Sequence, residues 1–123
     1  MPLFSATIDH DLMGMPRLCH GRRNARDNRY FSNRNALAWQ LMAERTPRNS
    51  TIDVIVSVLV SIWFPNNRRI DIDNAVKTVL DALVFGEVIK DDHLVHHLDA
   101  RLFRGAKKGV VSVIVKRYNE LPA

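Results

Sequence analysis

Apolar and polar side chains alternate along residues 52–64. Every even position in this segment is apolar: Ile52, Val54, Val56, Val58, Val60, Ile62 and Phe64. A period of two, with many β-branched residues, is typical of a strand with one buried face. Residues 65–67, Pro-Asn-Asn, follow this segment and predict the turn that ends the strand.

Two other segments show the spacing of amphipathic helices. In residues 33–45, Leu37 and Leu41 fall on one side; Ser32 is the expected N-cap, and Pro47 is expected to end the helix. In residues 73–85 the apolar stripe consists of Val76, Val79, Leu80 and Leu83. Gly86 fits the left-handed position that commonly ends a helix.

The remaining segments complete an α/β (α+β) fold with a small mixed sheet. Residues 3–8, 95–103 and 110–118 are expected to form strands, and residues 104–109 to form a hairpin loop between the last two. Residues 14–29 have no apolar period and are expected to form a loop. We find no repeat or linker, so residues 1–123 are expected to form a single domain.

Composition narrows the class of protein. The chain has 123 residues, of which 46% are hydrophobic and 25% charged, which is typical of a globular protein. The single cysteine, Cys19, permits no intrachain disulfide. No segment approaches the roughly 18 apolar residues of a membrane span. The N-terminus also lacks a signal-peptide pattern, so we expect a cytoplasmic protein.

The charge distribution favours a polyanionic partner. Lysine and arginine number 18 against 13 acids, the formal net charge is +5 and the pI is about 9.9. Basic residues flank an acidic centre, and nucleic acid is the commonest partner of such domains. The alternative is that these are ordinary solvated loops. The candidate phosphate contacts are Arg22, Arg23, Arg26, Arg29, Arg68, Arg69, Arg104, Lys107 and Lys108.

Three aspartates are candidates for chemistry. Asp71 and Asp73 are two residues apart before the second helix, and an extended approach would direct both carboxylates the same way. A divalent cation would relieve their repulsion, and Mg²⁺ prefers oxygen ligands. The helix could return Asp92 to the same place. The structural alternative makes Asp73 a helix cap and pairs Lys77 with Asp73 and Asp81.

The same region resembles the RusA family of Holliday junction resolvases. The family core reads D-x-D-N-x-x-K-x-x-x-D-A-L, followed by a short turn and a D-D pair. Residues 68–95, about a quarter of the chain, match this pattern. Matched by position, Asp71, Asp73 and Asp92 would be the essential carboxylates and metal ligands, and Lys77 the catalytic lysine. Asn74, Asp81 and Asp91 would be supporting residues.

The resemblance implies a small mixed α/β domain that forms a homodimer. It implies an endonuclease that resolves four-way DNA junctions by paired phosphodiester hydrolysis, in recombination and repair. The implied cofactor is Mg²⁺, with Mn²⁺ as a substitute. The family usually has P-P-S-x-N after the first strand, whereas residues 13–17 read Met-Gly-Met-Pro-Arg. This departure bears on the preferred DNA structure more than on the metal chemistry.

Other functions stay open from the sequence. The chain could be a nuclease for flaps or forks, or a non-catalytic basic module that binds nucleic acid. Tyr30, Phe31 and Phe103 could wedge between unstacked bases, although aromatic residues more often belong to the core. His96 and His97 are adjacent and would face opposite sides of a strand, which disfavours a zinc site.

Overall fold

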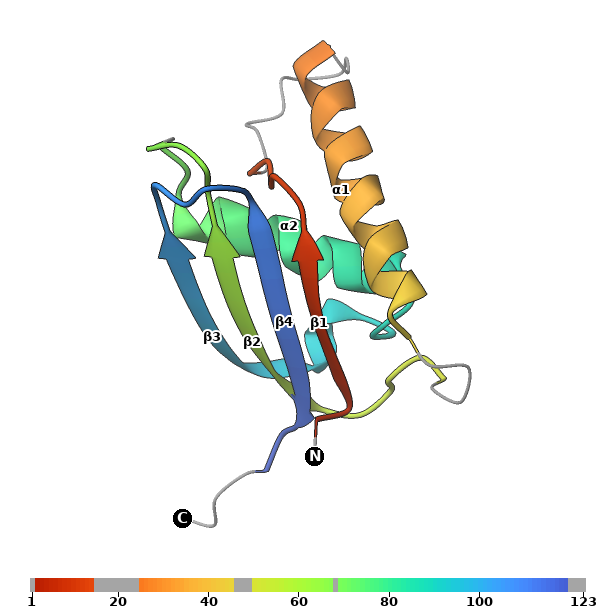
Figure 1. Ribbon diagram of the computed structural model, residues 1–123. Coiled ribbons are helices and arrows are strands. Elements are labelled where there is room, and N and C mark those ends of the chain that lie inside the picture. The colour runs from red at the N-terminus through yellow and green to blue at the C-terminus, as the bar shows by residue number, and fades with distance from the viewer. Residues whose placement is uncertain (1, 15–24, 46–49, 68, 120–123) are drawn as a thin grey trace.

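A four-stranded mixed sheet and two helices form the two layers of the molecule (Figure 1). The computed structural model describes residues 2–14, 25–45, 50–67 and 69–119. The elements in chain order are β1 (Phe4–Asp9), α1 (Ala25–Ala43), β2 (Val56–Trp63), α2 (Ile72–Phe85), the 3₁₀ turn η1 (Asp92–Leu94), β3 (Val95–Phe103) and β4 (Val110–Arg117). The expected α+β fold with two main helices is confirmed.

The order of the strands is β1-β4-β2-β3. β4 runs antiparallel to both β1 and β2, whereas β3 runs parallel to β2. The expected hairpin between the last two strands is therefore wrong, because β2 lies between β3 and β4. The connecting segment crosses the end of β2 instead: Phe64 N donates to Phe103 O at 2.8 Å, and Ala106 N donates to Phe64 O at 3.0 Å.

β2 is shorter at its start than the alternating pattern predicts. Residues 52–55 lie outside the strand, apart from an isolated bridge between Ile52 and Ile89. The ladders supply the reason, because Val56 already pairs with Val95 and Arg117, the first residue of β3 and the last of β4. Before Val56 neither ladder continues, and the remaining contact with the end of β4 is the hydrogen bond that Tyr118 N donates to Ile55 O at 3.0 Å. Within β2 the predicted alternation is confirmed, since its even positions are buried.

α1 is longer than predicted and begins at Ala25. Ser32 is therefore an interior helical residue and not the N-cap, and the expected loop is wrong for residues 25–29. The physical reason is Tyr30, whose fully buried side chain extends the stripe of Leu37, Ala38 and Leu41 toward the start of the helix. The helix ends at Ala43, and Pro47 and Cys19 lie outside the described residues.

α2 begins one residue before the predicted range and ends at Phe85 as predicted, but the conformation of the residues that end it differs from the prediction. Gly86 has φ −79°, so the expected left-handed conformation is wrong at this residue, and Glu87 adopts φ +59° instead. A Cβ on Gly86 would lie 2.7 Å from Ala38 O. Gly86 is thus required by the close approach of α1 to the end of α2, a tertiary contact that helix-ending rules do not anticipate.

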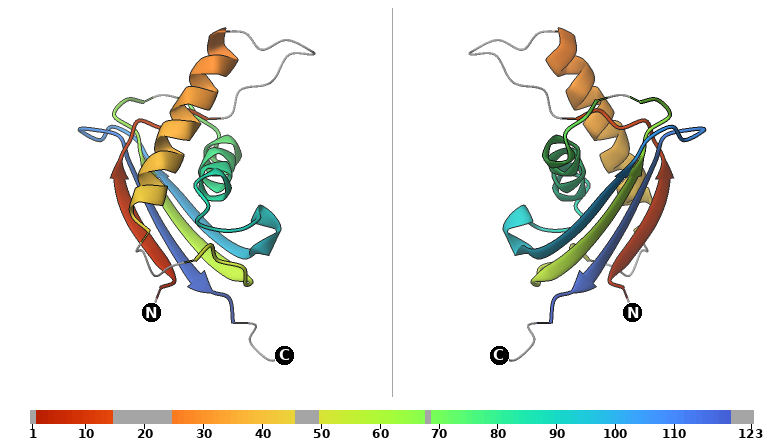
Figure 2. Two further views of the ribbon diagram at one scale, coloured as in Figure 1. Left: turned by 90° about the vertical axis from the view of Figure 1, so that its right-hand side faces the viewer. Right: turned by 90° about the vertical axis from the view of Figure 1, so that its left-hand side faces the viewer.

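Both helices lie on one face of the sheet, as the side views show (Figure 2). Alternate strand residues point into the layer between sheet and helices, where they are largely or fully buried. Within the described residues, no helix covers the other face of the sheet. No helix in that part of the chain is long and apolar enough to span a bilayer.

Candidate active site

The first turn of α2 carries two of the three candidate metal ligands. Asp71 is the N-cap residue, in an extended conformation, and its side chain makes no capping hydrogen bond. Its main-chain oxygen accepts from Ala75 N at 3.0 Å. Asp73 lies inside the first turn, where Oδ1 accepts from Asn74 N at 3.0 Å. The expected extended approach is wrong for Asp73, because the helix begins at Ile72. Both carboxylates are exposed.

Lys77 joins α2 to the segment that follows it. Its Nζ lies 2.9 Å from Asp81 Oδ1 and 3.8 Å from Asp92 Oδ2. The expected ion pair with Asp81 is confirmed. Asp92 lies beside Lys77 on α2, but the expected gathering of Asp92 with Asp71 and Asp73 is not found among the described residues. The expected pairing of Lys77 with Asp73 is wrong, since Asp81 and Asp92 are the acids in reach within the described chain. The hydrogen bond that Lys77 donates to Asp81 is the main cause of the raised pKa of Lys77.

The two adjacent aspartates after α2 have different local roles. Asp91 is the N-cap of η1 and accepts from His93 N at 3.2 Å, while His93 Nδ1 lies 3.3 Å from the same carboxylate. The hydrogen bonds from His93 lower the pKa of Asp91. Asp91 therefore shapes the turn, and the carboxylate of Asp92 is the one that approaches Lys77.

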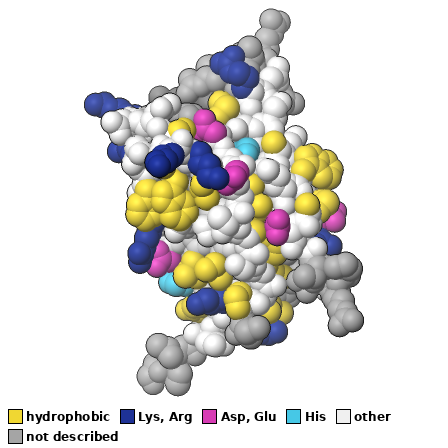
Figure 3. All heavy atoms as spheres, viewed as in Figure 1, with side chains coloured by type: hydrophobic (Ala, Val, Ile, Leu, Met, Phe, Trp, Pro, Cys, Tyr) yellow, Lys and Arg dark blue, Asp and Glu magenta, His cyan; other side chains and the backbone are white. Residues whose placement is uncertain are grey.

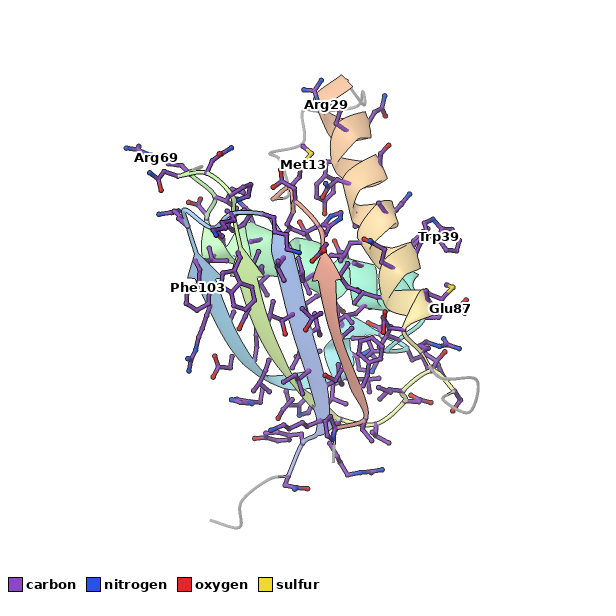
Figure 4. The ribbon with its side chains drawn as sticks, viewed as in Figure 1. Met13, Arg29, Trp39, Arg69, Glu87 and Phe103 are labelled. Carbon is purple, nitrogen blue, oxygen red and sulfur yellow. The ribbon has the colours of Figure 1, made fainter. Side chains whose placement is uncertain are left out.

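A connection between β1 and the two helices holds the start of α2 in place. Asn33 Oδ1 accepts from Met13 N at 2.9 Å and lies 3.0 Å from His10 Nε2. Asn33 Nδ2 donates to Asp11 O at 2.8 Å. Thr78 Oγ1 donates to Met13 O at 3.0 Å. Figure 4 shows Met13 between the end of β1 and α1.

Sequence reasoning missed this network. Thr78 is fully buried. In the sequence, the one indication of this role is that a polar residue stands beside the apolar stripe of α2. Asn33 gave none, because its partners are 20 or more residues away. Gly14 lies close to Ile70, since a Cβ on Gly14 would be 2.9 Å from Ile70 Cγ2. The chain before α1 is therefore packed against the residue that precedes Asp71.

The donor set suits a hard divalent cation. In the described part of the chain, no three Asp, Glu, His or Cys side chains are gathered closely enough to enclose a metal as they stand. Asp71, Asp73 and Asp92 nevertheless offer exposed carboxylate oxygens, the ligands that Mg²⁺ prefers alongside several waters. The ammonium group of Lys77 is the cation that lies beside Asp92. The chemistry of these oxygen donors suits a partly hydrated magnesium ion, although the three carboxylates do not form one cluster in the described chain.

The neighbouring histidines are arranged differently from the prediction. A register shift between Val56 and Ser57 leaves His96 outside the regular pairing. The rings of His96 and His97 lie 6.0 and 6.5 Å from the ring of Tyr118. The expectation that they face opposite sides is wrong, because both rings approach the same tyrosine.

The candidate phosphate contacts divide into two groups. The exposed ones in the described chain are Arg29, Arg69, Arg104, Lys107 and Lys108, and Arg69 is labelled in Figure 4. Arg104 Nη2 lies 3.5 Å from Ile70 O, which connects the β3–β4 segment to the residue before Asp71. Arg22, Arg23 and Arg68, and the side chain of Arg26, lie outside what the structure describes.

Comparison with known proteins decides the family. The family model for Endodeoxyribonuclease RusA matches residues 14–116, which is most of the chain. The chain belongs to the RusA family. A curated member, "Crossover junction endodeoxyribonuclease RusA" of Aquifex aeolicus (strain VF5), is 32% identical to this RusA-family chain over 78 residues. That alignment covers 63% of this chain and 59% of the Aquifex protein.

Proposed function

We propose that this chain is a magnesium-dependent endonuclease that cuts branched DNA. The observation that carries the proposal is the approach of Lys77 on α2 to Asp92 on η1, next to the turn that bears Asp71 and Asp73. Membership of the RusA family supports DNA as the substrate. The name of the Aquifex relative supports a crossover junction as its form.

In this proposal Asp71, Asp73 and Asp92 hold the metal through their carboxylates. Bound Mg²⁺, or Mn²⁺ in its place, would supply positive charge that activates a water and offsets the charge developing on the phosphate. Asp71 is available for this role because its side chain caps nothing. Asp91 cannot serve as readily, because its carboxylate is hydrogen-bonded within η1.

Lys77 binds the scissile phosphate in this proposal. Its raised pKa, due mainly to Asp81, keeps the side chain charged at neutral pH, so it donates hydrogen bonds and does not take up a proton. A positioned cation at a developing oxyanion typically contributes about 10²- to 10³-fold in rate. Asp81 positions Lys77 through the 2.9 Å hydrogen bond. Asn74 supports the same turn of α2.

Basic residues would bind the DNA backbone beside these groups. Arg69 and Arg104 flank the segment that leads into α2, and Lys107 and Lys108 follow in the connection to β4. Phosphate contacts of this kind set the register of the DNA without reading its sequence. The proposed contacts at Arg22, Arg23, Arg26 and Arg68 rest on their charge alone.

We also propose that the active form is a homodimer. A four-way junction presents two nearly equivalent strands, and a twofold dimer presents two identical sites to them. Light scattering at the protein concentration of the cleavage assay would give twice the mass of one 14.1 kDa chain. A monomer mass together with paired cleavage would contradict this part of the proposal.

The test of function is cleavage of a synthetic four-way junction, with a flap and a linear duplex beside it. Each substrate is incubated with Mg²⁺ or with EDTA, using the unmodified chain, Asp73→Asn and the control Asp53→Asn. Asp53 is an exposed aspartate that pairs with Lys90 at 3.3 Å and is not one of the proposed metal ligands. The expected result is paired cuts in the junction that require Mg²⁺ and are lost only in Asp73→Asn.

Other results would assign a different function. Cutting of the flap or the duplex at comparable rates would support the metal-dependent nuclease activity but reject the junction as the preferred substrate. Binding of the junction without cleavage under any divalent metal would favour a non-catalytic nucleic-acid-binding module. Full cleavage by Asp73→Asn would reject the proposed metal ligands.

A further inference from the structure

A pair of stacked aromatic rings lies on the face of the sheet that no described helix covers. The rings of Trp63 on β2 and Phe103 on β3 are 5.1 Å apart with an interplanar angle of 14°. The two residues are direct partners in the parallel ladder, so both side chains point to the same face. β3 is the edge strand, and Phe103 remains 41% exposed.

The orientation of these rings leaves an aromatic face open. A second exposed aromatic pair, Trp39 with Phe85, meets edge to face at 85°, and the Arg34 guanidinium lies 5.1 Å from the centre of the Phe85 ring. Trp63 and Phe103 are nearly parallel instead. A third flat ring can therefore continue the stack beyond Phe103, at the edge of the sheet.

Basic side chains surround this aromatic pair. Lys107 and Lys108 line a shallow hollow of about 280 Å³ whose wall includes Trp63. Arg104 directly follows Phe103, and Arg101 precedes it by two residues. In Figure 3 this face shows a hydrophobic patch with Lys and Arg side chains beside it, and Figure 4 labels Phe103 in the same view.

Hydrogen bonds link the end of β3 to the end of β2 and, through Arg104, to the residue before Asp71. Phe103 O accepts from Phe64 N at 2.8 Å, which fixes the end of β3 against the end of β2. Arg104 Nη2 lies 3.5 Å from Ile70 O, immediately before Asp71. A DNA strand that stacks a base on Phe103 thus has cationic side chains along its path toward the carboxylates.

We propose that Trp63 and Phe103 form a stacking platform for an unpaired base of the DNA substrate. The proposal rests on the proposed nuclease function and adds a base-binding site to it. Flat aromatic faces with cations beside them can bind both parts of a nucleotide. The aromatic faces stack on the base, and the cations attract the phosphate. Stacking of this kind tolerates any base sequence, which suits unpaired bases at a branch point.

Trp63 itself can report on the test. The chain contains two tryptophans, so Trp39→Phe leaves Trp63 as the single source of tryptophan fluorescence. This variant is titrated in EDTA with single-stranded oligothymidylate, and in parallel with an abasic strand that has the same phosphates but no bases. We expect saturable quenching of Trp63 by oligothymidylate and little quenching by the abasic strand.

Two further variants separate stacking from packing. Phe103→Ala in the Trp39→Phe chain is expected to weaken binding of oligothymidylate by roughly 5- to 150-fold, the usual range for one stacked base. Phe103→Leu keeps much of the apolar volume and should weaken binding by a similar factor if stacking is what matters. Binding of the abasic strand should change little in either variant.

Three results would overturn the proposal. Equal quenching by the abasic strand would assign the signal to phosphate binding alone. Binding of oligothymidylate without quenching would place the bases elsewhere. A Trp63 emission that changes with protein concentration as the mass doubles, without DNA, would make this face an interface between two copies of the chain. Each result is independent of junction cleavage in Mg²⁺, so the proposed function could stand or fail separately.

Discussion

The ammonium of Lys77 lies 3.8 Å from a carboxylate oxygen of Asp92, a residue that the proposed function assigns to the metal. One cation of the protein thus occupies part of the space in which a metal would bind. Asp81, at 2.9 Å, is the closer partner and draws the lysine away from Asp92. In the proposal, this relationship makes Lys77 both a competitor of the metal for Asp92 and its partner in cleavage.

Removal of the competing charge should tighten metal binding while it slows cleavage. Two unit charges about 4 Å apart in water interact by about 1 kcal/mol, so Lys77→Met should raise the affinity for Mg²⁺ by roughly fivefold. The rate of cleavage at saturating Mg²⁺ should fall by about 10²- to 10³-fold, because a charge at the phosphate is lost. Calorimetric titration with Mg²⁺ and single-turnover cleavage measure the two effects.

A matched control is Lys90→Met, because Lys90 is also an exposed lysine paired with an aspartate, Asp53, at 3.3 Å. Neither the affinity for Mg²⁺ nor the cleavage rate should change in this variant. Weaker Mg²⁺ binding in Lys77→Met would contradict the competition and indicate that the lysine supports the metal site.

The hydroxyl of Thr78 should stabilise the fold through the segment before α1. Thr78→Val keeps the shape of the side chain but removes the 3.0 Å donor to Met13 O. We expect a loss of about 1 to 2 kcal/mol in the free energy of unfolding, because a part-buried carbonyl is left without its donor. Urea denaturation measures this loss. Thr78→Ser retains the hydroxyl, so a comparable loss in that variant would point to packing in place of the hydrogen bond.

Stability should fall in mild acid because of His10. Burial lowers the pKa of His10, which the Asn33 hydrogen bond and Asp11 only partly offset. Between the lowered folded pKa and the unfolded value of about 6.5, the unfolded chain binds more protons than the folded chain. The stabilisation present above pH 6.5 is therefore lost as the pH falls through this window.

Urea denaturation at several pH values between 7.5 and 5 would measure this effect, with His10→Gln as the comparison. The unfolding free energy of the unmodified chain should decrease more steeply toward acid than that of the variant. A steeper decrease in His10→Gln would contradict the direction of the pKa shift.

At the end of α2, substitutions at Gly86 and Glu87 should change the free energy of unfolding in opposite directions. Gly86→Ala would place a Cβ 2.7 Å from Ala38 O and should cost about 1 to 3 kcal/mol, as overpacking usually does. Glu87→Gly would relieve a left-handed conformation that costs about 1 to 2 kcal/mol in a residue with a Cβ. The greater freedom of glycine in the unfolded chain offsets about 0.5 to 1 kcal/mol of that gain.

Thermal or urea unfolding of both variants would decide which residue carries the left-handed turn. A destabilised Gly86→Ala beside a neutral or stabilised Glu87→Gly is the expected pattern. A clear loss of stability in Glu87→Gly would contradict the assignment of the turn to Glu87.

Local pattern was enough to predict several elements of this chain. The alternation of Val56, Val58, Val60 and Ile62 and the stripe of Val76, Val79 and Leu83 each express one buried face, a property that the sequence carries directly. The ion pair of Lys77 with Asp81 could likewise be predicted, because helical spacing alone brings the two side chains together. The match of Asp71, Asp73 and Asp92 to the RusA motif likewise depends on residue type and spacing alone.

What the sequence could not supply came from contacts between distant segments. The start of β2 depends on where β3 and β4 stop, and the insertion of β2 between them removes the expected hairpin. The start of α1 depends on burial of Tyr30, and the form of the α2 terminus depends on the approach of Ala38 to Gly86. Such features are set by neighbours that are remote in sequence, so only the packed chain determines them.

In the candidate site, too, some features follow from the sequence alone and others only from the tertiary structure. The sequence alone determined which acids and which lysine are available, since residue types and spacing are local. Only the tertiary structure decided that Asp92 approaches Lys77 while Asp91 caps η1, and that Asn33 and Thr78 hold Met13 against α2. It also decided that Trp63 and Phe103 stack on an open face. The physical reason is that side-chain meetings depend on strand order and helix packing, which follow from the burial of the whole core.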